Sequence, residues 1–111
     1  MPATPRFAHN VYFELRDSSP AAQDRLIAAC YDKLGGIECV DFLAAGPRDR
    51  ELQRDVNDQG FDVALHVFFA DRAAHDAYQN APAHLEFIHD NQDNWRSVRV
   101  FDSTLVTNEP R

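Results

Sequence analysis

Apolar and polar residues alternate in three stretches of the chain, a pattern that predicts β-strands. In residues 7–15 the apolar side chains and His9 fall on one side of the strand. Residues 61–69 repeat the alternation, and residues 97–104 place Val98, Val100 and Asp102 on a common face. Because successive side chains of a strand point to opposite faces, each of these strands is expected to bury one face.

Three helices are predicted from apolar spacing and from the residues at their ends. The first covers residues 20–34, with Ser19 as its N-cap and two glycines, Gly35 and Gly36, at its end. The second follows Asp71, a suitable N-cap, and the third begins at Pro82, since proline is favoured in the first turn of a helix.

A further strand is expected over residues 37–43, with Gly46-Pro47 ending it. The order of elements is then strand, helix, strand, strand, broken helix, strand. This order predicts a ferredoxin-like α+β sandwich, in which a four-stranded antiparallel sheet carries helices on one face. The 111 residues are assigned to one domain, with its core in residues 7–104.

The sheet face without helices is expected to be aromatic, because it would carry Tyr12, Phe68 and either Phe42 or Phe101. An exposed apolar patch of this kind indicates an interaction site, and no helix remains to cover it. We therefore expect a second copy of the chain to cover it, so that two sheets pack face to face in a homodimeric α/β barrel.

Composition and charge exclude several classes of partner. The formal charge is −7, and Arg48, Arg50 and Arg54 alternate with acidic residues, so neither nucleic acid nor an anionic membrane is an expected partner. No apolar run is long enough for a membrane span, and the N-terminus lacks a signal-peptide pattern, so a cytoplasmic protein is expected. Cys30 and Cys39 have no metal or redox spacing and are expected to be reduced.

Four polar side chains occupy positions where the periodicity predicts apolar ones: His9, Tyr78, His84 and Asp102. All four are expected to face the space between the sheet and the helices. There His84 would act as general base with Asp102 fixing its tautomer, while Tyr78 and His9 stabilise a developing oxyanion. The apolar residues expected to bind a substrate beside them are Val11, Val63, Leu65, Ile88 and Trp95.

The other three histidines are expected to lie apart from this site. Strand and helix phases place His66 on the uncovered sheet face and His75 and His89 off the apolar stripes. A metal site needs several ligands in one place, so no metal ion is expected, and acid/base chemistry needs no cofactor.

Four segments carry a resemblance to a known family: F-A-H-N-V-Y-F-E-L, G-F-D-V-A-L-H-V-F-F, Y-Q-N-A-P-A-H-L-E-F and W-R-S-V-R-V-F-D. Together they resemble the stress-responsive dimeric α/β-barrel (Dabb) family over residues 7–103. The family includes plant stress-induced proteins and a polyketide cyclase similar to olivetolic acid cyclase. The resemblance implies a ferredoxin-like protomer, a homodimeric barrel and a pocket between sheet and helices.

The resemblance also implies roles for the same four residues. By motif, His9 matches the first-strand histidine of the cyclase, Tyr78 the pocket tyrosine, His84 the catalytic histidine and Asp102 its orienting carboxylate. One position departs from the cyclase, because Val63 stands where the cyclase has a further histidine. The same substrate is therefore not implied.

Three functions stay open on these residues. The first is a cofactor-free enzyme, either a lyase or cyclase of the aldol type or an isomerase, with a cofactor-free monooxygenase as a variant. The second is a protein that binds a small hydrophobic or aromatic ligand without converting it. The third is a structural, stress-associated dimer in which His84 and Asp102 form a satisfied buried pair.

Overall fold

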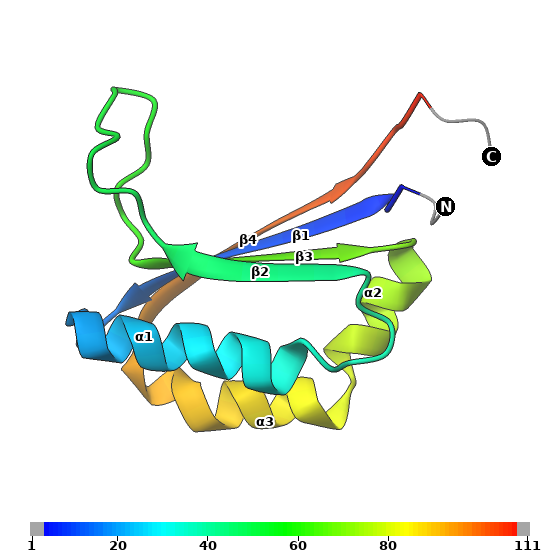
Figure 1. Cartoon of the computed structure of the whole chain (residues 1–111), viewed down its shortest axis with the longest axis horizontal. Helices are drawn as coiled ribbons and strands as arrows, with labels where there is room; N and C mark the ends of the chain where they lie inside the picture. The colour runs from blue at the N-terminus through cyan, green and yellow to red at the C-terminus, as the bar shows by residue number, and fades with distance from the viewer. Residues whose placement is uncertain (1–3, 109–111) are drawn as a thin grey trace.

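The computed structural model describes residues 4–108, which form one layer of strands and one layer of helices (Figure 1). In chain order the elements are β1 (Phe7–Leu15), α1 (Pro20–Ala29), the π-helical turn η1 (Cys30–Leu34), β2 (Phe42–Pro47), β3 (Val63–Phe69), α2 (Arg72–Gln79), α3 (Pro82–Asn91), the 3₁₀ turn η2 (Gln92–Asn94) and β4 (Trp95–Thr104).

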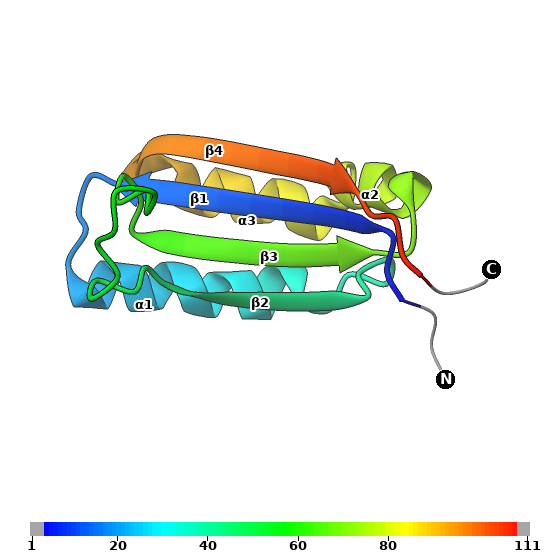
Figure 2. The same cartoon turned by 90° about the horizontal axis from the view of Figure 1, so that it is seen from above.

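All strand pairs are antiparallel, and the sheet has the order β2-β3-β1-β4. Helix α1 runs under β2 and β3, helix α3 lies under the other half of the sheet, and α2 stands at one end (Figures 1 and 2). The predicted ferredoxin-like sandwich is therefore confirmed, with all helices on one face of the sheet.

Two of the predicted helix ends are also confirmed. The Ser19 hydroxyl accepts a hydrogen bond from the backbone N–H of Ala22, and Pro20 follows in the first turn of α1. The Asp71 carboxylate accepts from the backbone N–H of Ala74 at 2.9 Å and caps α2 in the same way. Each cap satisfies a backbone donor that has no partner within the helix.

The second strand lies further along the chain than predicted. Residues 37–41 form turns, with the N–H of Ile37 bonded to the carbonyl of Leu34 and the N–H of Val40 bonded to that of Ile37. Gly46 and Pro47 are the last residues of β2 rather than its terminator. Proline has no backbone N–H to donate, so within sheets it is confined mainly to edge strands. Pro47 fits this rule, because β2 is an edge strand.

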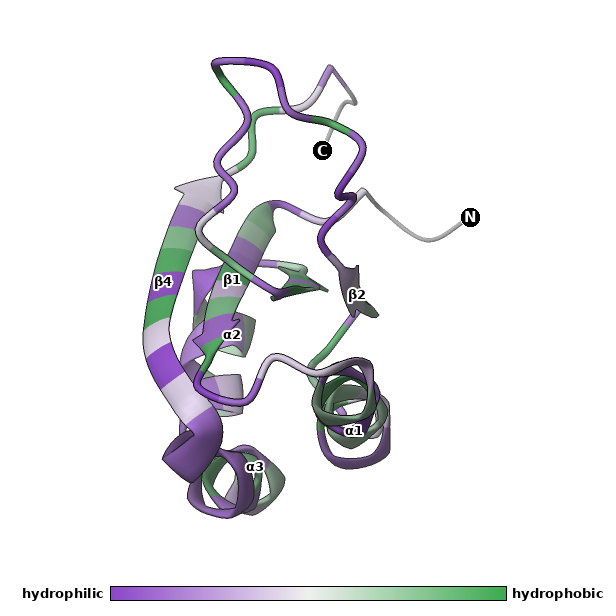
Figure 3. Ribbon diagram, turned by 90° about the vertical axis from the view of Figure 1, so that its left-hand side faces the viewer, coloured by the Kyte–Doolittle hydropathy of each residue, from purple (hydrophilic) through white to green (hydrophobic). Residues whose placement is uncertain are grey.

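The core lies between the sheet and the helices, and β1 and β3 supply most of its buried residues. Hydrophobic and hydrophilic residues alternate along β1 and β4 in Figure 3. The buried members of the core include Val11, Phe13, Leu65 and Phe69 from the strands and Cys30 from η1. Both cysteines are free thiols, as predicted, and burial raises the pKa of Cys30 to about 12. No helix in the described part of the chain is long and apolar enough to cross a membrane.

Candidate functional site

A cavity of about 160 Å³ lies between the sheet and the helices α2 and α3. Its polar lining comes from His9, Tyr78, Gln79 and His84. Its apolar lining comes from Val11, Phe13, Leu65, Phe87, Ile88, Trp95, Val98 and Val100. Of the five apolar residues predicted to bind substrate, four are in this lining, whereas Val63 is buried in the core outside it.

His9 is paired with Asp102 at the edge of this cavity. The two residues are directly opposite one another in the β1–β4 register, on the helix-facing side of the sheet. Nδ1 of His9 lies 2.5 Å from Oδ1 of Asp102. Because a carboxylate accepts the hydrogen bond, the imidazole donates from Nδ1 and keeps a lone pair on Nε2. Burial lowers the pKa of His9, and the carboxylate of Asp102 opposes this shift.

This pairing corrects the sequence-based expectation, which joined Asp102 to His84. In the structure Nδ1 of His84 donates to the backbone carbonyl of Gln79 at 3.2 Å. That carbonyl belongs to the last turn of α2, where backbone acceptors lack partners within the helix. Of the four residues expected to share one space, His9, Tyr78 and His84 line one cavity, whereas Asp102 is not among its lining residues.

Tyr78 stands between the two histidines. The centroid of its ring is 5.9 Å from that of His9 and 4.6 Å from that of His84. Burial raises the pKa of Tyr78 well above its usual value, and burial also lowers the pKa of His84. The cavity thus places a neutral phenol beside two imidazoles whose neutral forms are favoured by burial.

His75 lies next to this group, although the helical phase separated it from the apolar stripe. Its side chain is 13% exposed, and its ring lies 4.7 Å from that of Phe7 and 5.2 Å from that of His9. Nε2 of His75 is 4.0 Å from Oδ2 of Asp102. Helix α2 has only eight residues and stands at the end of the sheet (Figure 2). His75 on this helix packs against Phe7 of β1 and Phe69 of β3. The i, i+3 spacing of His75 and Tyr78 is a sequence signal that could have suggested a shared side of the helix.

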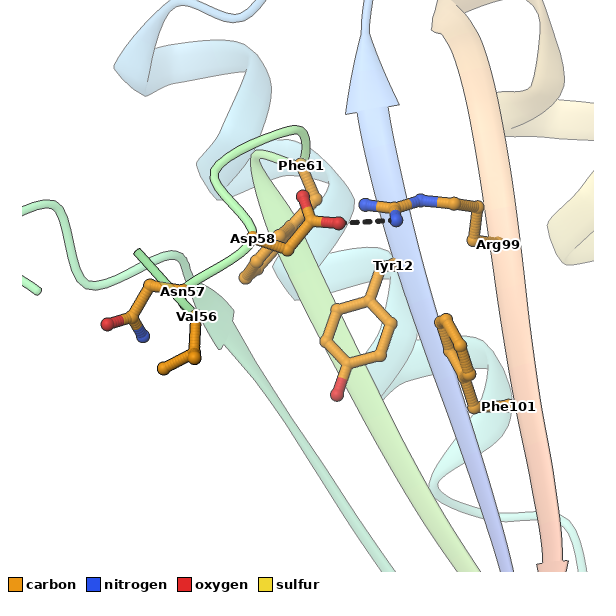
Figure 4. A pocket seen from close by; sticks show the side chains of 7 residues that line it. All are labelled: Tyr12, Val56, Asn57, Asp58, Phe61, Arg99 and Phe101. Carbon is orange, nitrogen blue, oxygen red and sulfur yellow. Dashed lines mark hydrogen bonds and ion pairs between the residues drawn. The ribbon is translucent and has the colours of Figure 1, made fainter. Parts of the chain in front are cut away.

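A larger hollow lies on the opposite face of the sheet (Figure 4). It measures about 390 Å³ and is lined by Tyr12, Val56, Asn57, Asp58, Phe61, Arg99 and Phe101. Arg99 donates to Asp58 at 2.6 Å, and this bond, with one from the N–H of Gly60, lowers the pKa of Asp58 to about 2. The loop between β2 and β3 rises on this side of the sheet (Figure 1), so this hollow belongs to the uncovered aromatic face and not to the site of the four predicted residues.

His66 on this outer face makes the stability of the protein depend on pH. Its Nδ1 donates to Oδ1 of Asn10 at 2.7 Å, and burial lowers its pKa. The unfolded chain therefore takes up a proton near pH 6.5, before the folded one does. The stabilisation is complete above pH 6.5 and is lost as the pH falls below it.

We expect His66→Gln to show a smaller loss of Tm than the wild type between pH 7.5 and 5.5. His89→Gln on the exposed side of α3 should keep the wild-type slope, and an unchanged slope in His66→Gln would contradict the assignment.

The comparisons with known proteins assign the chain to a family. The model of the stress-responsive A/B barrel domain (Dabb) matches residues 7–105. The chain therefore belongs to the Dabb family, as the four sequence segments indicated. No curated protein matches the chain.

Several solved structures share the fold. A protein of Arabidopsis thaliana is 21% identical, with a TM-score of 0.77 over 94% of this chain and 99% of that one. A Dabb protein with a ferredoxin-like fold from Mesorhizobium loti is 20% identical, with a TM-score of 0.75 over 94% and 100%. A hydroxynitrile lyase from Passiflora edulis is 22% identical, with a TM-score of 0.72 over 96% and 100%. At these identities the likeness shows the fold alone.

Proposed function

We propose that the cavity binds a small, mostly apolar carbonyl compound and that His9, held by Asp102, moves a proton to and from it without a cofactor. The observation that supports this most is the 2.5 Å bond from Nδ1 of His9 to Asp102 beside a cavity that also contains Tyr78. A carboxylate in this position fixes the histidine tautomer and stabilises the imidazolium that forms. The role of base thus passes from His84, where the sequence placed it, to His9.

Each remaining polar group has a place in this step. Nε2 of His9 removes a proton from the carbon next to the carbonyl, and the electrons of the C–H bond form an enolate. The phenol of Tyr78, kept protonated by its raised pKa, donates a hydrogen bond to the enolate oxygen. Nε2 of His84 is an acceptor, because its Nδ1 is engaged with Gln79, and it orients a hydroxyl or acid group of the compound. The proton then returns from His9 to the product.

The size of the cavity limits the compound. About 160 Å³ is well below the roughly 300–1,000 Å³ of sites for drug-sized ligands. Apolar side chains provide most of the lining, so a short chain or a single aromatic ring fits better than an extended polyketide. A hydroxynitrile lyase has the same fold, and this supports an enzymatic site for a small compound here.

A thermal-shift screen tests the proposal. Planar phenolic acids, β-keto acids and fatty acids are added to the wild type, to His84→Gln and to His89→Gln, whose histidine lies on the exposed side of α3. A ligand at 100 times its Kd stabilises the folded state by about 2.7 kcal/mol, which raises Tm by several degrees. We expect at least one compound to stabilise the wild type and His89→Gln but not His84→Gln.

Two results of this screen would count against the site. Equal stabilisation of His84→Gln would place the ligand elsewhere, and the absence of any stabilising compound would favour a structural role for the histidine. Stabilisation without any conversion of the compound would favour a binding protein over an enzyme.

We also propose that two copies of the chain pair through the aromatic face of the sheet. Phe42 and Phe101 on this face are 55% and 54% exposed, and Tyr12 stacks edge-on against Phe61 and Phe101. An apolar surface of this kind is rarely left uncovered in a soluble monomer. Structures of the same fold from Thermobifida fusca and Bacteroides fragilis are described as dimeric, which supports an isologous pairing here.

A further inference from the structure

We infer that His9, His75 and Asp102 together bind a divalent transition-metal ion, with Zn²⁺ the best match. The three residues come from β1, α2 and β4, and one ligand atom of each lies within 4.8 Å of the others. This inference goes beyond the proposed function, because metal binding needs no turnover. It also revises the expectation that the histidines of this chain are too far apart to share an ion.

The tautomer of His75 is already the one that a metal requires. Nδ1 of His75 lies 3.0 Å from Oδ1 of Asp76, and since a carboxylate only accepts, this nitrogen carries the proton. Nε2 is left with a lone pair, and the amide nitrogen of Gln79 lies 3.4 Å from it, as expected for a donor facing that lone pair. A carboxylate that holds the far nitrogen of a metal-binding histidine is a common arrangement in metal sites.

The ligand atoms of the three residues would have to shift to fit a tetrahedral site. With Zn–N and Zn–O bonds of about 2.0–2.2 Å, ligand atoms lie about 3.3–3.5 Å apart. Here Nδ1 of His9 is 2.5 Å from Oδ1 of Asp102, and Nε2 of His75 is 4.0 Å from Oδ2. These two distances end on different oxygens of Asp102, and one ligand atom from each of the three residues lies within 4.8 Å of the others, so binding one ion requires side-chain shifts of up to about 1.4 Å. The side chain of Asp102 is 40% exposed, which gives it room to move and leaves a position for water.

The charges around the three ligands favour a cation. The side chains of Asp102 and Asp76 are negatively charged. The neighbouring positive charge is Arg72, whose Nε donates to Asp76 at 2.9 Å. Two carboxylates against one guanidinium leave a local excess of negative charge. Two imidazoles and one carboxylate favour Zn²⁺, Co²⁺ or Ni²⁺ over Mg²⁺ and Ca²⁺, which prefer oxygen ligands alone.

An ion at this site would exclude His9 from acting as a base. Coordination through Nδ1 of His9 moves the imidazole proton from Nδ1 to Nε2, so Nε2 becomes a hydrogen-bond donor toward the cavity instead of an acceptor. The metal ion and the proton shared with Asp102 therefore compete for the same nitrogen. Zinc is expected to inhibit the proposed proton transfer.

Titration calorimetry with ZnCl₂ on the metal-free full chain tests the site. The variant is His75→Phe, which removes the nitrogen but keeps an aromatic ring against Phe7 and Phe69. The matched control is His89→Phe, because His89 is also followed by an aspartate, with Nδ1 3.2 Å from Oδ1 of Asp90. We expect one Zn²⁺ per chain in the wild type and in the control, and an affinity at least tenfold weaker in His75→Phe.

Two further measurements complete this test. Bound Co²⁺ should give the strong visible absorption of a four-coordinate ion, and MgCl₂ should give no binding heat. Wild-type affinity in a folded His75→Phe, or no zinc binding by the wild type, would overturn the inference. Asp102→Asn should weaken zinc binding as well, which covers the case in which His75→Phe fails to fold. Because these readouts involve no substrate, failure here leaves the acid/base proposal standing, and the reverse also holds.

Discussion

His9→Gln is expected to slow proton transfer in the cavity by about 10²–10⁴-fold, the usual contribution of a general base. Glutamine fills a similar volume and can donate to Asp102, but it cannot accept a proton at neutral pH. The loss corresponds to about 2.7–5.5 kcal/mol of activation free energy. It is measured with a small β-diketone, pentane-2,4-dione, as the uptake of deuterium from D₂O at its central carbon by NMR.

Two companion variants separate a chemical role from a structural one. Asp102→Asn keeps the shape of the pair but removes the charge that stabilises the imidazolium, so its exchange rate should also fall, with a smaller change in Tm because the carboxylate is partly exposed. His89→Gln should exchange deuterium at the wild-type rate. If His9→Gln retains the wild-type rate while His84→Gln loses it, the base is His84 and the assignment made here is wrong.

Phe101→Asp is expected to convert the protein from a dimer to a monomer. The aspartate would place an unpaired charge on the aromatic face, where it would have to be desolvated on pairing. Loss of an aromatic anchor residue from an interface typically costs about 2–4 kcal/mol, or about 30- to 1,000-fold in Kd. Light scattering after size exclusion should show a change from twice the chain mass to the single-chain mass of 12.6 kDa.

Leu85→Asp is the matched control for the dimer. Leu85 is 54% exposed, the same as Phe101, but it lies on α3 in the helix layer. Its replacement should therefore leave the native mass unchanged. A dimer that persists in Phe101→Asp, or one that is lost equally in Leu85→Asp, would exclude pairing through the aromatic face of the sheet.

The sequence predicted the elements of the fold where periodicity is strong. Strand β1 was predicted with its observed bounds, Phe7–Leu15, because nine residues alternate without interruption. The caps at Ser19 and Asp71 were predicted because a short polar side chain before a helix has one favoured role. Strand β2 was misplaced by several residues, because only hydrogen bonds to β3 define an edge strand with a weak apolar pattern.

Three of the four polar residues of the candidate site were placed together correctly, but the pairing of Asp102 and the position of His75 were not predicted. His9, Tyr78 and His84 line one cavity, as the faces of their strand and helices indicated. The partner of Asp102 could not be predicted, because alternation assigns a side chain to a face but says nothing of its neighbour across the sheet. The antiparallel register of β1 and β4 places Asp102 opposite His9.

By itself, then, the sequence determined which side of each element is buried, because the periods of strand and helix are local properties of the backbone. Only the tertiary structure decided how those sides meet. The β1–β4 register joined His9 to Asp102, and the position of the short helix α2 at the end of the sheet brought His75 to the same carboxylate. Both depend on contacts between segments far apart in the chain, which no local pattern encodes.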